Sequence, residues 1–179
     1  MRYEDTEFVT MFRKFGGIKR VVMSIDFQLS LSLGITFSVV TCYYGITKVI
    51  IAGVSPIFVT VSAAMIAIAI AGLAIIVSMS NPEFIKVLKH VGIYNNILFM
   101  FWYSTIISGL SITINTLSYA MQCITNENLY LSIFFLMSIF LVLYSIFSVI
   151  LLVGTTMRYG LYRGAFIEQE KKGEKSNKN

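Results

Sequence analysis

Four long apolar stretches, at about 21–44, 57–79, 97–123 and 130–157, take up most of this 179-residue chain. A helix rises about 1.5 Å per residue, so about 20 mainly apolar residues cross the roughly 30 Å of hydrocarbon in a bilayer. Each of the four stretches is long enough to do so. The sequence therefore predicts an all-α integral membrane protein with a four-helix transmembrane domain over 21–157.

The composition supports a membrane protein and leaves little room for anything else. Mean hydropathy is +0.78, with 56% hydrophobic and 13% charged residues, which lies outside the range of soluble globular proteins. Outside the spans we expect only an N-terminal segment (1–20), one connector, two small turns and a tail (158–179), disordered from Glu168 onward. The second span is expected to open after Pro56.

Lysine and arginine set the orientation of membrane helices. Of the 14 basic residues, five precede the first span, two lie between the second and third spans, and six follow the last span, whereas Lys48 alone falls in the opposite loops. Both termini and the middle connector should therefore be cytoplasmic. The net charge of +5 then reflects this bias and attraction to anionic lipids, and we expect no direct binding to nucleic acid.

Two segments outside the spans have apolar residues at helical spacing, which predicts short amphipathic helices lying on the inner leaflet. The first contains Phe8, Met11, Phe12 and Phe15, and the second contains Phe84, Val87, Leu88 and Val91. A frayed N-terminus is the alternative for the first segment.

The first span alternates small polar and apolar residues from Ser24 to Ser38. A period of two is typical of a transmembrane β-strand, but the other spans are unbroken apolar runs far too long for barrel strands. As a helix, this span has polar groups all round, so we expect it at the centre of the bundle or of an oligomer. The fourth span is rich in Leu, Ile and Phe and is expected to be the most lipid-exposed.

Small and polar residues at spacings of three and four mark surfaces where membrane helices approach closely. The third span has such a polar stripe. The second span has small residues at this spacing, and the alternative is that its alanines face lipid. The candidates for helix packing are Gly34, Ala63, Ala67, Ala71, Gly72 and Gly109; the polar stripe is Ser104, Ser108, Ser111, Asn115 and Ser118.

Asp26 is the one acidic or basic residue placed within a predicted span, one to two turns from its cytoplasmic end. A charged, unpaired carboxylate in hydrocarbon costs several kcal/mol, so such a residue is a functional candidate. Two interpretations are open. Asp26 could form a polar cluster with Gln28 and Asn115, although Asn115 should lie nearer the opposite face, or it could reach the inner surface and pair with Lys19 or Arg20.

Cys42 and Cys123 should both lie near the external face, where an oxidising compartment permits a disulfide. The sequence does not require this bond. His90 is the sole histidine, and only Glu83 lies at a spacing that approaches that of metal ligands. We therefore expect no metal site.

Motifs for catalysis are absent from the sequence: it has no nucleophile–base pair, glycine-rich phosphate loop or HExxH sequence. We therefore predict a protein that is not an enzyme and has no cofactor.

Four spans, internal termini, short outer turns and a basic tail resemble the small tetraspanning membrane subunits of bacterial antiphage systems of the Kiwa type. The resemblance covers the whole chain as architecture and assigns no residue a role. It implies a homo-oligomeric protein of the bacterial inner membrane that senses phage attack and acts with a cytoplasmic partner.

Two other functions are consistent with the same sequence. Polar faces on the first and third spans could line an ion channel or holin-like pore, with Asp26 near its inner mouth. A small transporter is the second alternative, because some four-span transporters have an acid in the first span, although at mid-membrane.

Overall fold

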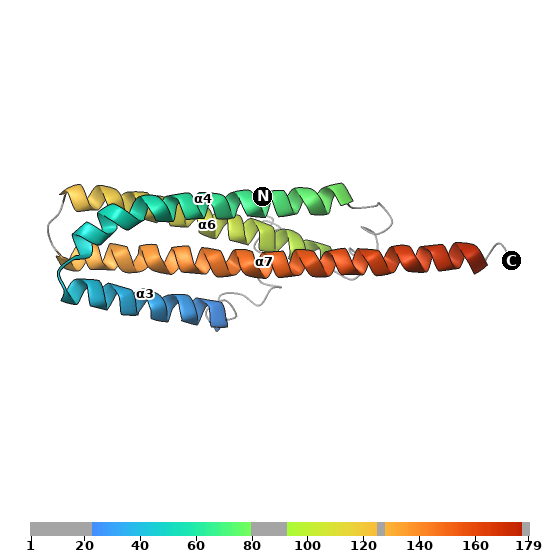
Figure 1. Cartoon of the computed structure of the whole chain (residues 1–179), viewed down its shortest axis with the longest axis horizontal. Helices are drawn as coiled ribbons and strands as arrows, with labels where there is room; N and C mark the ends of the chain where they lie inside the picture. The colour runs from blue at the N-terminus through green and yellow to red at the C-terminus, as the bar shows by residue number, and fades with distance from the viewer. Residues whose placement is uncertain (1–22, 80–92, 125–127, 177–179) are drawn as a thin grey trace, which may run out of the picture.

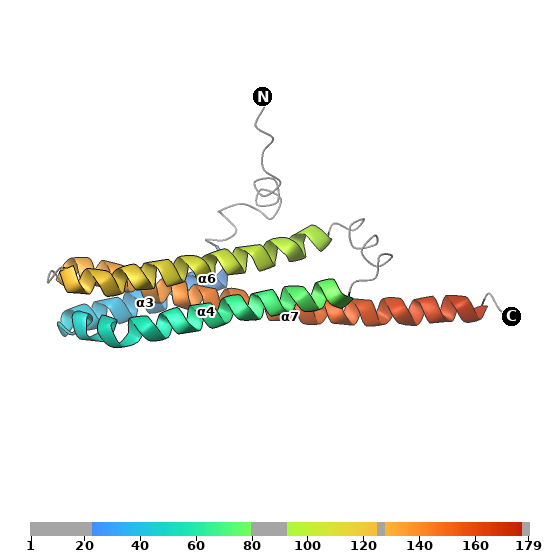
Figure 2. The same ribbon diagram turned by 90° about the horizontal axis from the view of Figure 1, so that it is seen from above.

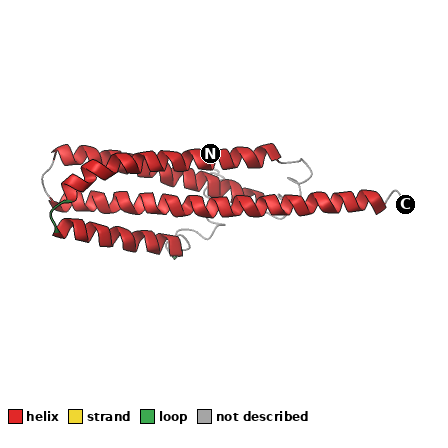
Figure 3. Ribbon diagram, in the orientation of Figure 1, coloured by secondary structure: helices red, strands yellow, loops and turns green. Residues whose placement is uncertain are grey.

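The computed structural model of the chain describes residues 23–79, 93–124 and 128–176. They form four helices, all long and apolar enough to cross a membrane: α3 (Ile25–Tyr43), α4 (Thr47–Met79), α6 (Ile93–Ile124) and α7 (Asn128–Ser176). The helices run side by side and alternate in direction along the chain (Figures 1 and 3). The expected amphipathic helices near 8–15 and 82–91 lie outside the described residues.

Helices α4, α6 and α7 form a three-helix core, and α3 packs on the outer side of α7 (Figures 1 and 2). The expectation that the first span is central in the bundle is therefore wrong for the single chain. Its place in an oligomer stays a prediction. The fourth span is also not the most lipid-exposed, because α7 contacts all three other helices and has the largest buried share.

Two local signals delimit α3. Ser24 caps its start by accepting a hydrogen bond from the backbone N–H of Phe27 at 3.3 Å. At its other end Gly45 has a φ of 66°, a left-handed conformation that glycine adopts without strain. The backbone N–H groups of Gly45 and Ile46 bond to the carbonyls of Cys42 and Thr41, which is the Schellman pattern that ends helices.

Helix α4 begins at Thr47, about ten residues before the expected start, and Pro56 lies inside it. From the sequence, proline predicts a boundary because it lacks a backbone N–H and usually interrupts a helix. Here the turn at Gly45 starts the helix, and the N–H of Ile50 already bonds to the carbonyl of Ile46. The first turns of α4 lie at an angle to the rest, as expected for a proline kink (Figure 1).

Helix α7 continues through the charged tail to Ser176, where we expected disorder from Glu168. Its 49 residues correspond to about 74 Å, more than twice the hydrocarbon thickness. Lys and Glu are good helix formers, and Glu168 and Lys172 have the spacing of a favourable helical pair. The last part of α7 therefore projects beyond the ends of α4 and α6 (Figure 1).

Buried residues of the core repeat every three and four positions, which is the spacing found in coiled coils. Two apolar clusters lie toward opposite ends of this core. One contains Ala69, Ile76, Ile97, Phe101, Leu152 and Tyr159, and the other contains Ile51, Leu131, Phe135 and Ile139.

Candidate functional site

Between the two apolar clusters, the inner face of α6 is polar and fully enclosed by the core. We call this face the α6 polar seam. The hydroxyl positions of the stripe expected from the sequence lie on it, and the structure adds Gln122. Its members, each 6% exposed or less, are Ser104, Ser108, Ser111, Asn115, Ser118 and Gln122.

Hydroxyl pairs join this seam to both neighbouring helices. Ser111 bonds to Ser62 of α4 at 2.8 Å between the Oγ atoms, and Ser108 bonds to Ser145 of α7 at 2.6 Å. A third pair, Ser118 with Ser138, again joins α6 to α7 at 2.8 Å. The polar stripe therefore joins helices within one chain, as small polar residues commonly do in membranes.

Three buried polar atoms of the seam have no hydrogen-bond partner among the described residues: Ser104 Oγ, Asn115 Oδ1 and Gln122 Oε1. The amide nitrogen of Asn115 is bonded, because it donates to the carbonyl of Ser111 at 2.8 Å. Buried polar atoms are rarely left unpaired, so these acceptors are the least satisfied part of the core.

Asp26 belongs to a second polar site, at the start of α3. It is half-buried in the first turn of the helix, next to Phe27, whose ring packs edge-on against Tyr144 of α7 with centroids 5.8 Å apart. Tyr144 also bonds to Tyr103 of α6, with 2.7 Å between the hydroxyl oxygens.

The contact of α3 with α7 shows where Asp26 lies along the bundle. The contact between Phe27 and Tyr144 places the start of α3 near the middle of the apolar part of α7, which runs from Leu129 to Met157. Asp26 therefore lies beside the middle of that stretch, and its depth in a membrane stays a prediction.

The three proposed intramembrane polar residues are not brought together. Gln28 is exposed on α3, whereas Asn115 is completely buried in the α4–α6–α7 core. Lys19 and Arg20, the alternative partners of Asp26, lie outside the described residues.

The candidate packing residues have different environments. Gly34 faces α7, where an added Cβ would lie 3.4 Å from Leu136, and Gly72 faces α6, where it would lie 2.9 Å from the ring of Phe101. Gly109 has no atom within 4 Å of such a Cβ. The alanines at 63, 67 and 71 are exposed, so within one chain Ala63, Ala67 and Ala71 make no core contact.

Cys42 and Cys123 are exposed, and both thiols are free in this structure. They lie in the last turns of α3 and α6, which end at the same end of the bundle (Figure 1). Within the described ranges no three His, Cys, Asp or Glu side chains gather where they could hold a metal ion.

A further polar stripe lies on α3, on the side that faces away from α7. Gln28, Ser32 and Thr36 are exposed at intervals of four residues, opposite the buried Ser30 and Gly34. The hydroxyls of Ser32 and Thr36 bond to carbonyls of their own helix, at 3.0 and 2.9 Å. The strict alternation in the sequence thus corresponds to two polar stripes on opposite sides of one helix.

The sequence reasoning missed the inner face of α7. The many large apolar residues of the fourth span favoured a lipid-facing helix, although Ser138 and Ser145 also lie on it. A signal was available in the three-and-four repeat Leu131, Phe135, Ser138, Val142, Ser145, Val149 and Leu152, all of which are buried.

No family model, curated protein or solved structure matches the chain. The findings support a multi-pass membrane protein with four candidate membrane-spanning helices, packed as a bundle.

Proposed function

We propose that this protein is a non-enzymatic module of the bacterial inner membrane that works by assembling with further copies of itself and with a soluble cytoplasmic partner. The observation that carries the proposal is the outward polar stripe of α3, formed by Gln28, Ser32 and Thr36. An amide side chain facing hydrocarbon is costly, whereas the same amide can bond to a neighbouring helix. A second copy supplies such a helix.

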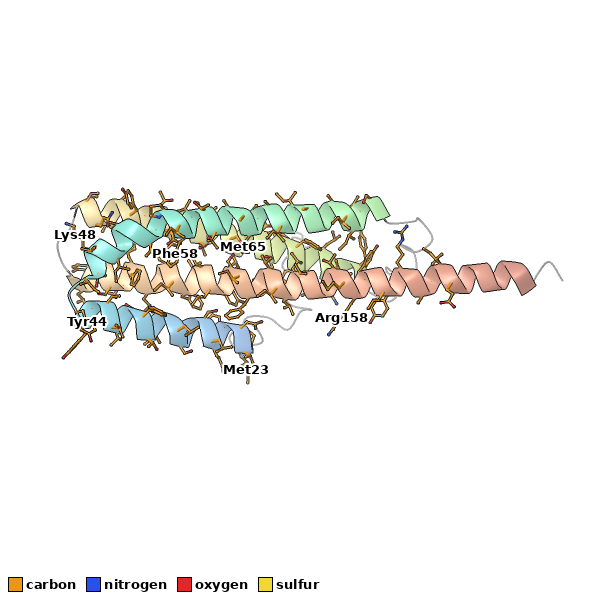
Figure 4. The ribbon with its side chains drawn as sticks, viewed as in Figure 1. Met23, Tyr44, Lys48, Phe58, Met65 and Arg158 are labelled. Carbon is orange, nitrogen blue, oxygen red and sulfur yellow. The ribbon has the colours of Figure 1, made fainter. Side chains whose placement is uncertain are left out.

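The projecting end of α7 supports a role for a soluble partner. It continues as a helix past α4 and α6, with the exposed Arg158 near its base (Figures 1 and 4). A basic helix that leaves the bilayer offers a surface to an acidic protein as well as to lipid headgroups. Together with the four-span layout, this is the arrangement expected of a membrane sensor or anchor subunit in an antiphage defence system.

The test is native mass spectrometry of the detergent-purified protein with whatever copurifies. We expect a defined oligomer that dissociates to smaller species on Gln28→Leu and persists on the control change Leu33→Ile, on another side of the same helix. We also expect truncation after Gly164 to release the cytoplasmic partner. A wild-type monomer without a partner contradicts the proposal.

A pore is the second candidate, because the same stripe on α3 could line a path between copies. The α6 polar seam does not serve this purpose, since its residues are enclosed within one chain. Ion flux in proteoliposomes separates the candidates. A pore conducts, changes ion preference on Asp26→Asn and loses flux on Gln28→Leu, whereas an assembly module gives no flux in any of these proteins.

A further inference from the structure

Helix α3 covers only part of one side of α7. Its contacts follow a line of residues four positions apart: the carbonyl of Ser132 accepts from Ser38 at 2.9 Å, Leu136 and Phe140 lie beside Gly34, and Tyr144 packs on Phe27. Because α3 begins at Ile25, none of the described helices continues this contact beyond Tyr144.

The same side of α7 continues as a stripe, at helical spacings of three and four, through the half-buried Phe147 and the exposed Leu151 and Gly154 to the exposed Arg158. Leu151 is 52% exposed, and no atom of the described residues lies within 4 Å of where a Cβ of Gly154 would be. The stripe therefore contains an apolar surface with an open space above the glycine.

The far end of this stripe is positively charged. Arg158 is exposed, and its side chain extends from α7 toward the side on which α3 lies (Figure 4). From Phe147 to Arg158 the helix rises about 16 Å, which is close to the roughly 15 Å of hydrocarbon in one leaflet. The stripe thus has the length of one acyl layer, with a cation at one end.

We infer that an anionic phospholipid of the inner leaflet binds in the space that the short α3 leaves on α7. One acyl chain lies along Phe147 and Leu151 and over Gly154, and the phosphate binds the guanidinium of Arg158. Arginine suits this role because its planar fork can donate two hydrogen bonds to one phosphate. This inference is independent of the proposed function.

Charge favours a lipid over a second copy at this position. Two copies related by a twofold axis along the membrane normal, joined through this stripe, would place their Arg158 side chains near one another. Like charges in that region repel, and each would still lack an anion. A phosphate supplies the opposite charge and needs no partner helix.

The experiment uses the full chain in vesicles of phosphatidylethanolamine with a minority of phosphatidylglycerol. A photoreactive amino acid replaces Leu151 in the stripe or, as a matched control, Val77, which is 60% exposed on α4. After illumination, mass spectrometry identifies the adducts. Phosphatidylglycerol should be enriched about fivefold at position 151 over position 77, because one basic residue near the surface is worth about 1 kcal/mol.

Two variants separate the headgroup contact from the chain contact. Arg158→Gln should remove the enrichment, whereas Arg163→Gln, on another side of α7, should leave it unchanged. Gly154→Leu should reduce all lipid adducts at 151 and none at 77. These positions are at least partly exposed, so the variants should fold, and size-exclusion chromatography checks that they do.

Three results would overturn the inference. The first is equal phosphatidylglycerol fractions at both positions, and the second is enrichment that survives Arg158→Gln. The third is adducts at 151 that join mainly to a second copy or to residues 1–22 of the same chain, because the occupant is then protein.

Discussion

The α4–α6–α7 core and the contact between α3 and α7 both use small polar residues, but in different ways. In the core, serine hydroxyls pair across helices, and large apolar clusters lie on both sides of the polar seam. On α3, the hydroxyl of Ser38 donates a hydrogen bond to the carbonyl of Ser132 on α7. Other close contacts between these two helices involve Gly34 and the ring of Phe27 near the start of α3. The comparison indicates that the core holds itself together, whereas α3 is a separately attached helix.

The largest expected effect lies in the core. Phe101 is 2% exposed and lies against Gly72, so Phe101→Ala leaves a cavity and should lower the free energy of unfolding by about 3–5 kcal/mol. Phe37 on α3 is 56% exposed, and Phe37→Ala should change it by less than about 0.5 kcal/mol. Reversible unfolding in mixed micelles measures both, and equal losses would show that the core is not the more cooperative region.

A glycine on α3 tests how that helix is attached. At Gly34 a Cβ would already lie 3.4 Å from Leu136 and 3.6 Å from Phe140, so Gly34→Leu must push α3 away from α7. We expect a loss of about 1–3 kcal/mol, with new proteolytic cleavage near 44–46 while α4, α6 and α7 stay protected. Gly109→Leu is the control, since its surroundings are open. Cleavage throughout the chain would mean that α3 and the core unfold as one unit.

These two regions also differ in how far the sequence could predict them. Four helices follow from apolar length alone, and the polar stripe of α6 follows from its spacing. Which helix is central does not follow, because Leu- and Phe-rich α7 is as suited to lipid as to a core, and in a bilayer both surroundings are apolar. The contacts between helices determine that α7 is central, because α7 has small residues such as Ser138 and Ser145 where α6 approaches closely.

The residue at which α3 begins was unpredictable for a related reason. Residues 21–24 are compatible with a helix, and only the cap at Ser24 shows that α3 starts there. Likewise, Pro56 was a reasonable boundary by local chemistry, yet the turn at Gly45 had already started α4. Local signals predicted which residues can end a helix but not which of them do.

A smaller effect should separate the pairing of serines in the core from the serines of α3. A double-mutant cycle on Ser108→Ala and Ser145→Ala should give a coupling energy of about 0.6 kcal/mol, the usual size for such bonds in membranes. Ser32→Ala combined with Ser145→Ala should give none, since Ser32 bonds to Leu29 in its own helix. Coupling in the second cycle would mean that α3 and the core communicate through more than packing.

The smallest expected effect concerns the two cysteines. If they were paired, α3 would no longer be a helix attached separately from the α4–α6–α7 core. A disulfide from Cys42 to Cys123 would join α3 to the core covalently and typically adds about 2–4 kcal/mol of stability. Because both thiols are free and exposed, we expect Cys42→Ser and Cys123→Ser to change the free energy of unfolding by less than about 0.5 kcal/mol. Both native thiols should also react with a maleimide in protein purified without reductant. Loss of labelling that a reductant restores, together with a drop in stability in either variant, would show instead that α3 is covalently fixed to the core.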